Sequence, residues 1–155
     1  MKTVDALLGF YHKTVGRGAQ LVPGLAPDDR GLMAEVDVAH PAEFGKAVKA
    51  LYANNLTTAV TQSATGSVAA FASAKTFDRT VAMEWLVEGQ HIASCAIEAS
   101  DDGRVWKILH RGPTVGHKKI DIFPGTAARQ VRLRILNASG TPKIRQFVVF
   151  DGGGK

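Results

Sequence analysis

The spacing of apolar residues changes near Asn55 from a helical period to a strand period, and this change constrains the fold more than any other feature of the chain. Before Asn55, apolar side chains recur every three to four residues. After it, they alternate with polar ones, as Val131, Leu133 and Ile135 do with Arg132 and Arg134. We therefore expect a helical N-terminal part, residues 1–54, and a β-rich part, residues 55–155.

Two amphipathic helices are predicted in residues 1–54. The first covers residues 4–15, with Thr3 as its N-cap and glycines at its end. The second begins with Pro41 in its first position, where a missing N–H costs nothing. Between them, Ala19–Leu25 is a short apolar run with the character of a strand. The N-terminal part should therefore be helix–strand–helix.

The β-rich part has the pattern of an antiparallel fold. The residues of Val81–Trp85 and of Ile144–Phe150 also alternate between two faces, as in half-buried strands. We expect Val81, Met83 and Trp85 on one face of the first strand and Ile144, Gln146, Val148 and Phe150 on one face of the second. Asp102-Gly103 lies between two strand-like runs, a strong hairpin signal. Short strands joined by such turns predict a mainly β fold, an antiparallel jelly-roll β-sandwich.

Composition excludes several classes of protein. The 155 residues are 45% apolar, which fits a soluble globular domain. No apolar run approaches the roughly 20 residues of a membrane span, and the N-terminus lacks the apolar region of a signal peptide. Cys95 is the only cysteine, so no internal disulfide forms, and the histidines lack zinc spacing. We expect no metal, no cofactor and no membrane partner.

The net charge of +5 belongs entirely to the β-rich part. Residues 55–155 carry thirteen Lys/Arg and eight Asp/Glu, whereas residues 1–54 carry six of each. These basic residues alternate along strands and do not cluster with exposed aromatic side chains. A solvated basic face is therefore favoured over a polyanion site, and nucleic acid is not an expected partner.

Several segments, taken in order, resemble a known enzyme family. They are Tyr11–Val22, Gly24–Leu32, Phe77–Gln90, Val115–Ile120 and Thr126–Leu133. Together they resemble the C-terminal part of α-L-fucosidases of glycoside hydrolase family 29, namely the end of the catalytic barrel followed by a discoidin-like β-sandwich. The family usually has an aliphatic residue where this chain has Pro23, and a proline fits badly in a central strand.

The resemblance implies a function without a catalytic centre in this chain. Family members hydrolyse α-L-fucosides with retention, using an aspartate nucleophile and a separate acid/base on earlier barrel strands, which this chain does not match. We therefore expect a carbohydrate-binding or structural C-terminal module whose partner is a glycan or fucoside-type sugar. The alternative is an oligomeric glycoside hydrolase, or another hydrolase, with a site newly assembled at a subunit interface. Whether the chain is an enzyme stays open at this point.

Two loops combine the side chains that sugar binding requires, namely polar donors and a flat apolar surface. They are Trp85–Gln90 and Gly116–Lys119, and the candidate carbohydrate-binding residues are Glu84, Trp85, Gln90, His117 and Lys118. Three of them have a structural alternative. Glu84 would fix the end of its strand, Trp85 would pack in the core, and His117 would lie in a solvated turn.

Other residues have structural expectations. Trp106 should pack in the core, and Cys95 should be a buried, inert thiol. Arg132 and Arg134 should pair with a carboxylate of Glu84, Glu88 or Glu98.

The N-terminal part predicts self-association. Its helices and the Ala19–Leu25 run have apolar faces that residues 1–54 cannot bury by themselves. Monomeric proteins rarely expose such patches, so we expect a homo-oligomer that covers them.

Overall fold

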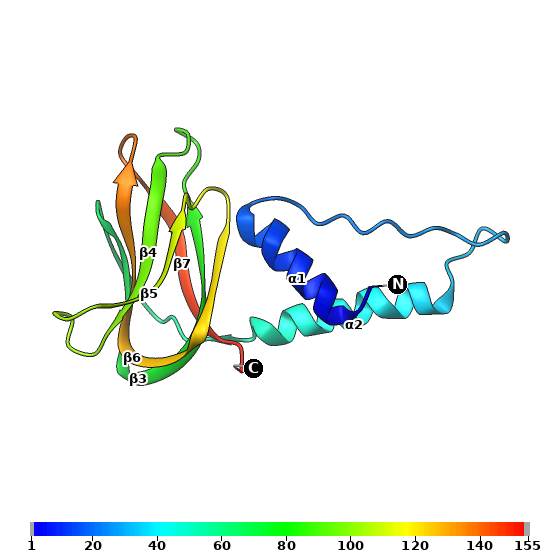
Figure 1. Ribbon diagram of the computed structural model, residues 1–155, viewed down its shortest axis with the longest axis horizontal. Helices are drawn as coiled ribbons and strands as arrows, with labels where there is room; N and C mark the ends of the chain where they lie inside the picture. The colour runs from blue at the N-terminus through cyan, green and yellow to red at the C-terminus, as the bar shows by residue number, and fades with distance from the viewer. Residues whose placement is uncertain (1, 154–155) are drawn as a thin grey trace.

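The computed structural model describes residues 2–153, and its helical part extends from one side of a compact β region (Figure 1). The helical part comprises α1 (Val4–Thr14), the 3₁₀ helix η1 (Val15–Arg17) and α2 (Glu35–Leu51). The β region comprises β1 (Asn54–Asn55), β2 (Val60–Ser63), β3 (Gly66–Glu84), β4 (Ile92–Ser100), β5 (Lys107–Pro113), β6 (Lys119–Ala138) and β7 (Ile144–Asp151). Within residues 2–153, no helix is both long and apolar enough to cross a membrane.

Helix α1 forms as its sequence predicts. The Thr3 hydroxyl accepts a hydrogen bond from the Ala6 N–H at 3.2 Å, which satisfies one of the free donors of the first turn. The helix tightens into η1 and then ends at Gly18, whose φ of +81° suits glycine.

Helix α2 begins at Glu35, so the prediction that it begins at Pro41 is wrong. Glu35 and Asp37 lie in the first turn, where acidic side chains interact favourably with the helix dipole. Pro41 lies inside the helix and cannot donate to the carbonyl of Asp37. The proline has a φ compatible with a helix, and the acidic first turn starts the helix before it.

The segment Ala19–Leu25 is extended, but it is not a strand of any sheet. The Ala19 N–H bonds to the Thr14 carbonyl and the Asp28 N–H to the Leu32 carbonyl. Among the described residues, the main chain between these two points forms no hydrogen bond. Pro23 and Pro27 further reduce its capacity to pair, because neither has an N–H. The predicted strand is therefore an unpaired extended run.

All strands of the β region join one antiparallel sheet in the order β1-β7-β3-β6-β4-β5, with β2 paired to β3. The mainly β, antiparallel fold is confirmed. Because hydrogen bonding links every strand into a single sheet, the two-sheet jelly-roll arrangement remains a prediction. The hairpin signal at Asp102-Gly103 is also confirmed, since β4 and β5 pair antiparallel on either side of it.

The sheet encloses its own core because β3 and β6 are long and bent. Their pairing shifts register between Ala70 and Lys75 and again between Phe77 and Arg79, and the two strands curve over at the lower end of Figure 1. Apolar side chains from β3, β4, β6 and β7 then meet in one cluster, which includes Phe77, Ala82, Ile97, Phe123, Val131, Leu133, Phe147 and Val149.

Alternation along the strands predicts the core in β6 but not in β7. Val131 and Leu133 are buried, with Arg132 and Arg134 on the opposite face, as expected. In β7 the core residues are Phe147, Val149 and Ile144, the last of which was predicted, whereas Gln146 is exposed. Neighbouring Val148 is also buried, so β7 is covered on both faces over this stretch and simple alternation fails.

Tyr52, just after α2, joins the helical part to the β region. Its ring packs edge-on against Phe150 of β7, with centroids 5.3 Å apart, and its hydroxyl bonds to His12 Nε2 at 3.0 Å. The Arg79 guanidinium lies 5.7 Å from the Tyr52 ring centroid. Burial raises the pKa of Tyr52 above its ordinary value, and burial together with the charge of Arg79 lowers the pKa of His12. Both side chains are therefore neutral near pH 7.

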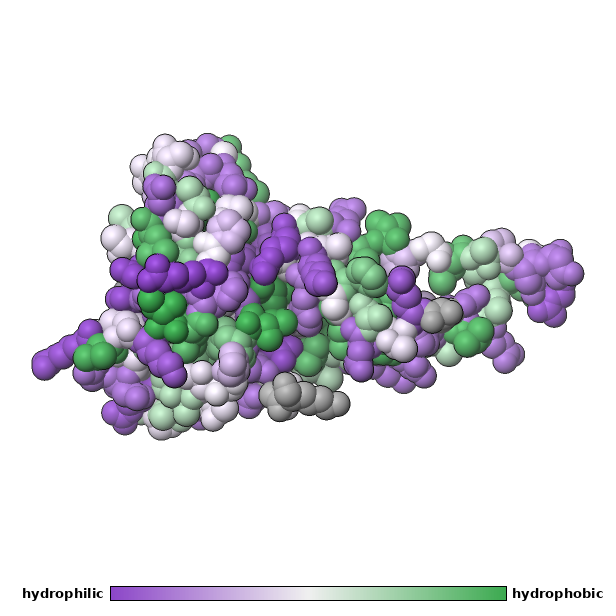
Figure 2. All heavy atoms as spheres, viewed as in Figure 1, coloured by the Kyte–Doolittle hydropathy of each residue, from purple (hydrophilic) through white to green (hydrophobic). Residues whose placement is uncertain are grey.

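The helical part has almost no interior of its own. Neither α1 nor α2 contains a buried residue. Figure 2 shows apolar surface among the polar residues along this arm. The large apolar side chains exposed there are Phe10, Val22, Leu25, Leu32, Met33, Val36 and Val38.

Gly66 provides a test of the β3–β6 pairing. It has φ +142°, and a Cβ at this position would lie 1.9 Å from the Leu133 carbonyl oxygen of β6. We expect Gly66→Ala to lower the free energy of unfolding by about 3 kcal/mol, because backbone strain and the clash act together. Urea denaturation measures this change.

Gly125→Ala is the matched control, because its φ is ordinary and no atom lies within 4 Å of the added methyl group. It should change stability by less than about 0.5 kcal/mol. Equal effects of the two substitutions would contradict the close approach of β3 to β6 at Gly66.

Candidate functional site

Glu84 lies at the end of β3 and is 2% exposed. One carboxylate oxygen accepts the His91 N–H at 2.7 Å and the Ile92 N–H at 3.0 Å. The other accepts the Gly116 N–H at 3.3 Å. The carboxylate is thus occupied by the main chain of two loops, residues 85–91 and 113–118. Of the two interpretations of Glu84, this geometry supports the structural one.

The same two loops place Gln90 beside Gly116. Gly89 has φ +98°, which suits glycine, and a Cβ at Gly116 would lie 3.1 Å from the Gln90 amide oxygen. The predicted residues Glu84, Gln90 and His117 are therefore brought to one end of the β region. The register of β3 and β6, in which Ala82 is opposite Lys119, accounts for this closeness.

Trp85 and Trp106 both lie outside the core, so the prediction that they pack inside it is wrong. Trp85 follows the last residue of β3 and is 44% exposed, and its main-chain N–H donates to the Lys143 carbonyl. Trp106 precedes β5, donates its indole N–H to the Gly103 carbonyl and stacks 4.0 Å from the Arg132 guanidinium. The alternation of buried and exposed side chains along a strand does not extend to these two residues, because both lie just outside their strands.

His117 and Lys118 line a hollow of about 490 Å³ between the Gly116 loop and the N-terminal segment. Its other walls come from Met83 of β3 and from the chain after η1, including Gln20. Gly18 lies against the Gly116 loop, since a Cβ there would be in van der Waals contact with the His117 side chain at 3.5 Å. Glu84, Trp85 and Gln90 are near this hollow in the fold but do not line it.

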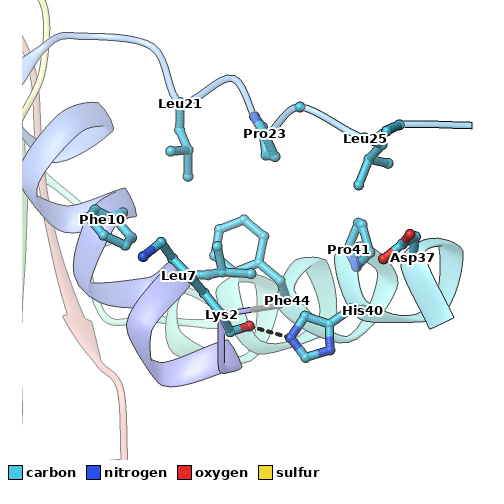
Figure 3. Close-up of a pocket in the computed structure, with 12 residues that line it drawn as sticks. Lys2, Leu7, Phe10, Leu21, Pro23, Leu25, Asp37, His40, Pro41 and Phe44 are labelled. Atoms are coloured by element: carbon cyan, nitrogen blue, oxygen red, sulfur yellow. Dashed lines mark hydrogen bonds between the residues drawn. The ribbon is translucent and has the colours of Figure 1, made fainter.

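A second hollow, of about 560 Å³, lies between the unpaired extended run and the two helices. Figure 3 shows Leu21, Pro23 and Leu25 pointing toward Phe44 and Pro41 across this space. At one edge His40 Nε2 bonds to the Lys2 carbonyl at 2.6 Å. The lining is mainly apolar, and Asp37 is its one carboxylate.

A buried charged cluster surrounds Asp121, and it was not predicted from the sequence. Asp121 and Lys119, both on β6 and two residues apart, form a buried ion pair. His110 Nε2 lies 3.3 Å from the Asp121 carboxylate, and Arg17 of η1 lies 3.8 Å from it. Arg17 also donates to the Ile120 carbonyl at 2.9 Å. The i, i+2 spacing of Lys119 and Asp121 places them on one face of the strand, which was the available signal.

The remaining charged groups have structural roles. Glu98 is the partner of Arg132 and Arg134, at 2.6 and 2.9 Å, and it is one of the three carboxylates predicted for them. Cys95 is buried, as predicted, and this burial raises the pKa of its thiol to about 11, which disfavours the reactive thiolate. Residues 2–153 contain no group of three or more His, Cys, Asp or Glu side chains placed to hold a metal ion.

No family model matches the chain. A rice (Oryza sativa subsp. japonica) protein described as "Putative alpha-L-fucosidase 1" is 23% identical over 96% of this chain and 35% of its own length. The crystal structure of a Bacteroides thetaiotaomicron protein, also described as a putative α-L-fucosidase, superposes with a TM-score of 0.89 at 26% identity, over 97% of this chain and 35% of that one. A family 29 fucosidase from Ruminococcus gnavus, solved in complex with fucose, has the same fold, with a TM-score of 0.84 at 21% identity, over 97% of this chain and 37% of that one.

The chain spans about a third of the length of these relatives. It is therefore homologous to a part of the family 29 α-L-fucosidases.

Proposed function

We propose that the chain is a non-catalytic module of the α-L-fucosidase type that binds a carbohydrate at one end of its β region. The observation that carries this proposal is the hollow beside His117 and Lys118. An imidazole, an ammonium group and the amide of Gln20 stand there beside apolar residues such as Met83. Sugar sites combine polar groups for the hydroxyls with an apolar wall for the ring.

The distribution of carboxylates supports a role without catalysis. Retaining glycosidases need two carboxyl groups about 5 Å apart across the scissile bond. Glu84 and Asp121 are buried, and each is already bonded to other groups of the chain. Asp37 is the only carboxylate that lines either of the two hollows. The family resemblance likewise assigns the nucleophile and the acid/base to another part of the enzyme.

The proposed site predicts weak sugar binding that depends on His117. Titration with L-fucose or galactose should give a dissociation constant near the millimolar range, about 4 kcal/mol of binding free energy, because a shallow site contacts only part of one sugar. His117→Ala should weaken binding about fivefold, the equivalent of one hydrogen bond. Calorimetry and chemical-shift mapping measure both effects.

Lys107→Ala is the matched control, since Lys107 is exposed at the start of β5, away from the residues that line the hollow. It should bind like the unmodified chain. Equal binding by the His117→Ala variant, or shifts confined to α2, would contradict the proposed site. Turnover of a chromogenic α-L-fucoside that is abolished by Asp121→Asn would contradict the non-catalytic assignment.

We also propose that the helical part is covered by a second copy of the chain. Without a cover, α1, α2 and the segment that joins them expose seven large apolar side chains and an open apolar hollow. Monomers rarely tolerate an apolar patch of this kind. The helical part has no net charge to oppose association, whereas two β regions would repel each other.

Sedimentation at micromolar concentration should therefore give a multiple of the 16.5 kDa chain mass. Val22→Asp should shift the species toward the monomer, because Val22 is 81% exposed on the extended run. Val105→Asp is the matched control, since Val105 is 77% exposed on the β region, and it should associate like the unmodified chain. A strict monomer before any substitution would rule out this association.

A further inference from the structure

Lys118 and Lys119 are neighbours in sequence but have opposite surroundings. Lys119 is 2% exposed and is paired with the buried carboxylate of Asp121. Lys118 is half-buried, lines the 490 Å³ hollow and has no carboxylate within 4 Å among the described residues. A cation held in the wall of a hollow without an acidic partner is available to a ligand.

The other polar groups of the hollow are also unused. Within residues 2–153, the side chains of Gln20, His117 and Lys118 form no hydrogen bond to the protein. No Asp or Glu lines the hollow. The hollow therefore has donors and one full positive charge, but no group that would repel an anion.

The size and walls of the hollow suit one sugar ring. Its volume of about 490 Å³ falls within the range of about 300 to 1,000 Å³ that is typical of small-molecule sites. Leu21, Val22 and Met83 add apolar surface to the lining of the hollow. A bare inorganic anion would leave this apolar surface without a contact, whereas a saccharide with an acidic substituent would use both the apolar surface and the donors.

We propose that this hollow selects anionic saccharides, that is, sugars bearing a sulfate or carboxylate group, over neutral ones, and that Lys118 is the residue that selects the charge. The inference rests on the carbohydrate-binding function proposed above and adds the class of ligand. Gln20 brings a donor from the N-terminal segment, so the site exists only where that segment meets the Gly116 loop. The excess of thirteen basic over eight acidic residues in the β-rich part favours the approach of anions to this part of the molecule.

The test compares galactose 6-sulfate with galactose by calorimetry on the full chain. The sulfated sugar should bind about tenfold more tightly, since one partly solvated charge pair corresponds to about that factor. The ratio of the two affinities should fall toward one in high salt, because the charge pair is screened. Lys118→Gln keeps a donor but removes the charge, so it should reduce the ratio to about one.

Lys107→Gln removes the same charge from an exposed position outside the hollow and should leave the tenfold ratio unchanged. Equal affinity for the two sugars in the unmodified chain would overturn the charge selection while leaving the proposed carbohydrate-binding function standing. Binding of neither sugar would overturn both. Inorganic sulfate that binds as tightly as galactose 6-sulfate would show a simple anion site and would also overturn the inference.

Discussion

The pairing of β3 with β6 is the interaction on which the rest of the structure depends. Every other strand attaches to this pair directly or through one neighbour. β2 and β7 pair with β3, with β1 beyond β7, and β4 pairs with β6, with β5 beyond β4. The register shifts within the pair bend the sheet around a single apolar core. The same register brings the end of β3 beside the start of β6, so the loops after Glu84 and before Lys119 meet.

The two carboxylates nearest the candidate site have different uses from those of a glycosidase. Glu84 accepts three main-chain N–H groups and fixes both loops, while Asp121 holds Lys119 and approaches Arg17 of the N-terminal segment. Because these anions are already paired, the free polar groups that remain at this end are donors. We therefore propose that the site recognises oxygen-rich or anionic ligands and does not use a carboxylate for proton transfer.

The sequence predicted those parts of the fold that depend on local pattern. The change of hydrophobic period near Asn55, the Asp102-Gly103 hairpin and the alternation in β6 all follow from neighbouring residues. The start of α2 could not be predicted in this way, because Pro41 is compatible with both the first turn and the interior of a helix. In β7, Phe147 and Val149 are buried as well as the expected Val148, because both faces of that strand are covered over this stretch.

The site was predictable only in part, for the same reason. The loops around Gln90 and His117 were identified because their residue types suit sugar binding, and the fold brings them together. The hollow itself could not be identified from the sequence, because one of its walls comes from Gln20 and its neighbours, which are far in the sequence from His117. Likewise, the absence of any buried residue in α1 and α2 emerges only from packing, although their apolar faces predicted that something must cover them.

The central claim is that the β region stands on its own core, while the helical part depends on contacts outside itself. Amide hydrogen exchange of the chain in dilute solution tests this most directly, because protection reports local stability segment by segment. We expect the slowest exchange at Ala82 of β3 and Val131 of β6, near the limit set by global unfolding, and much faster exchange throughout α1 and α2. Protection of both helices equal to that of β3 and β6 would contradict it.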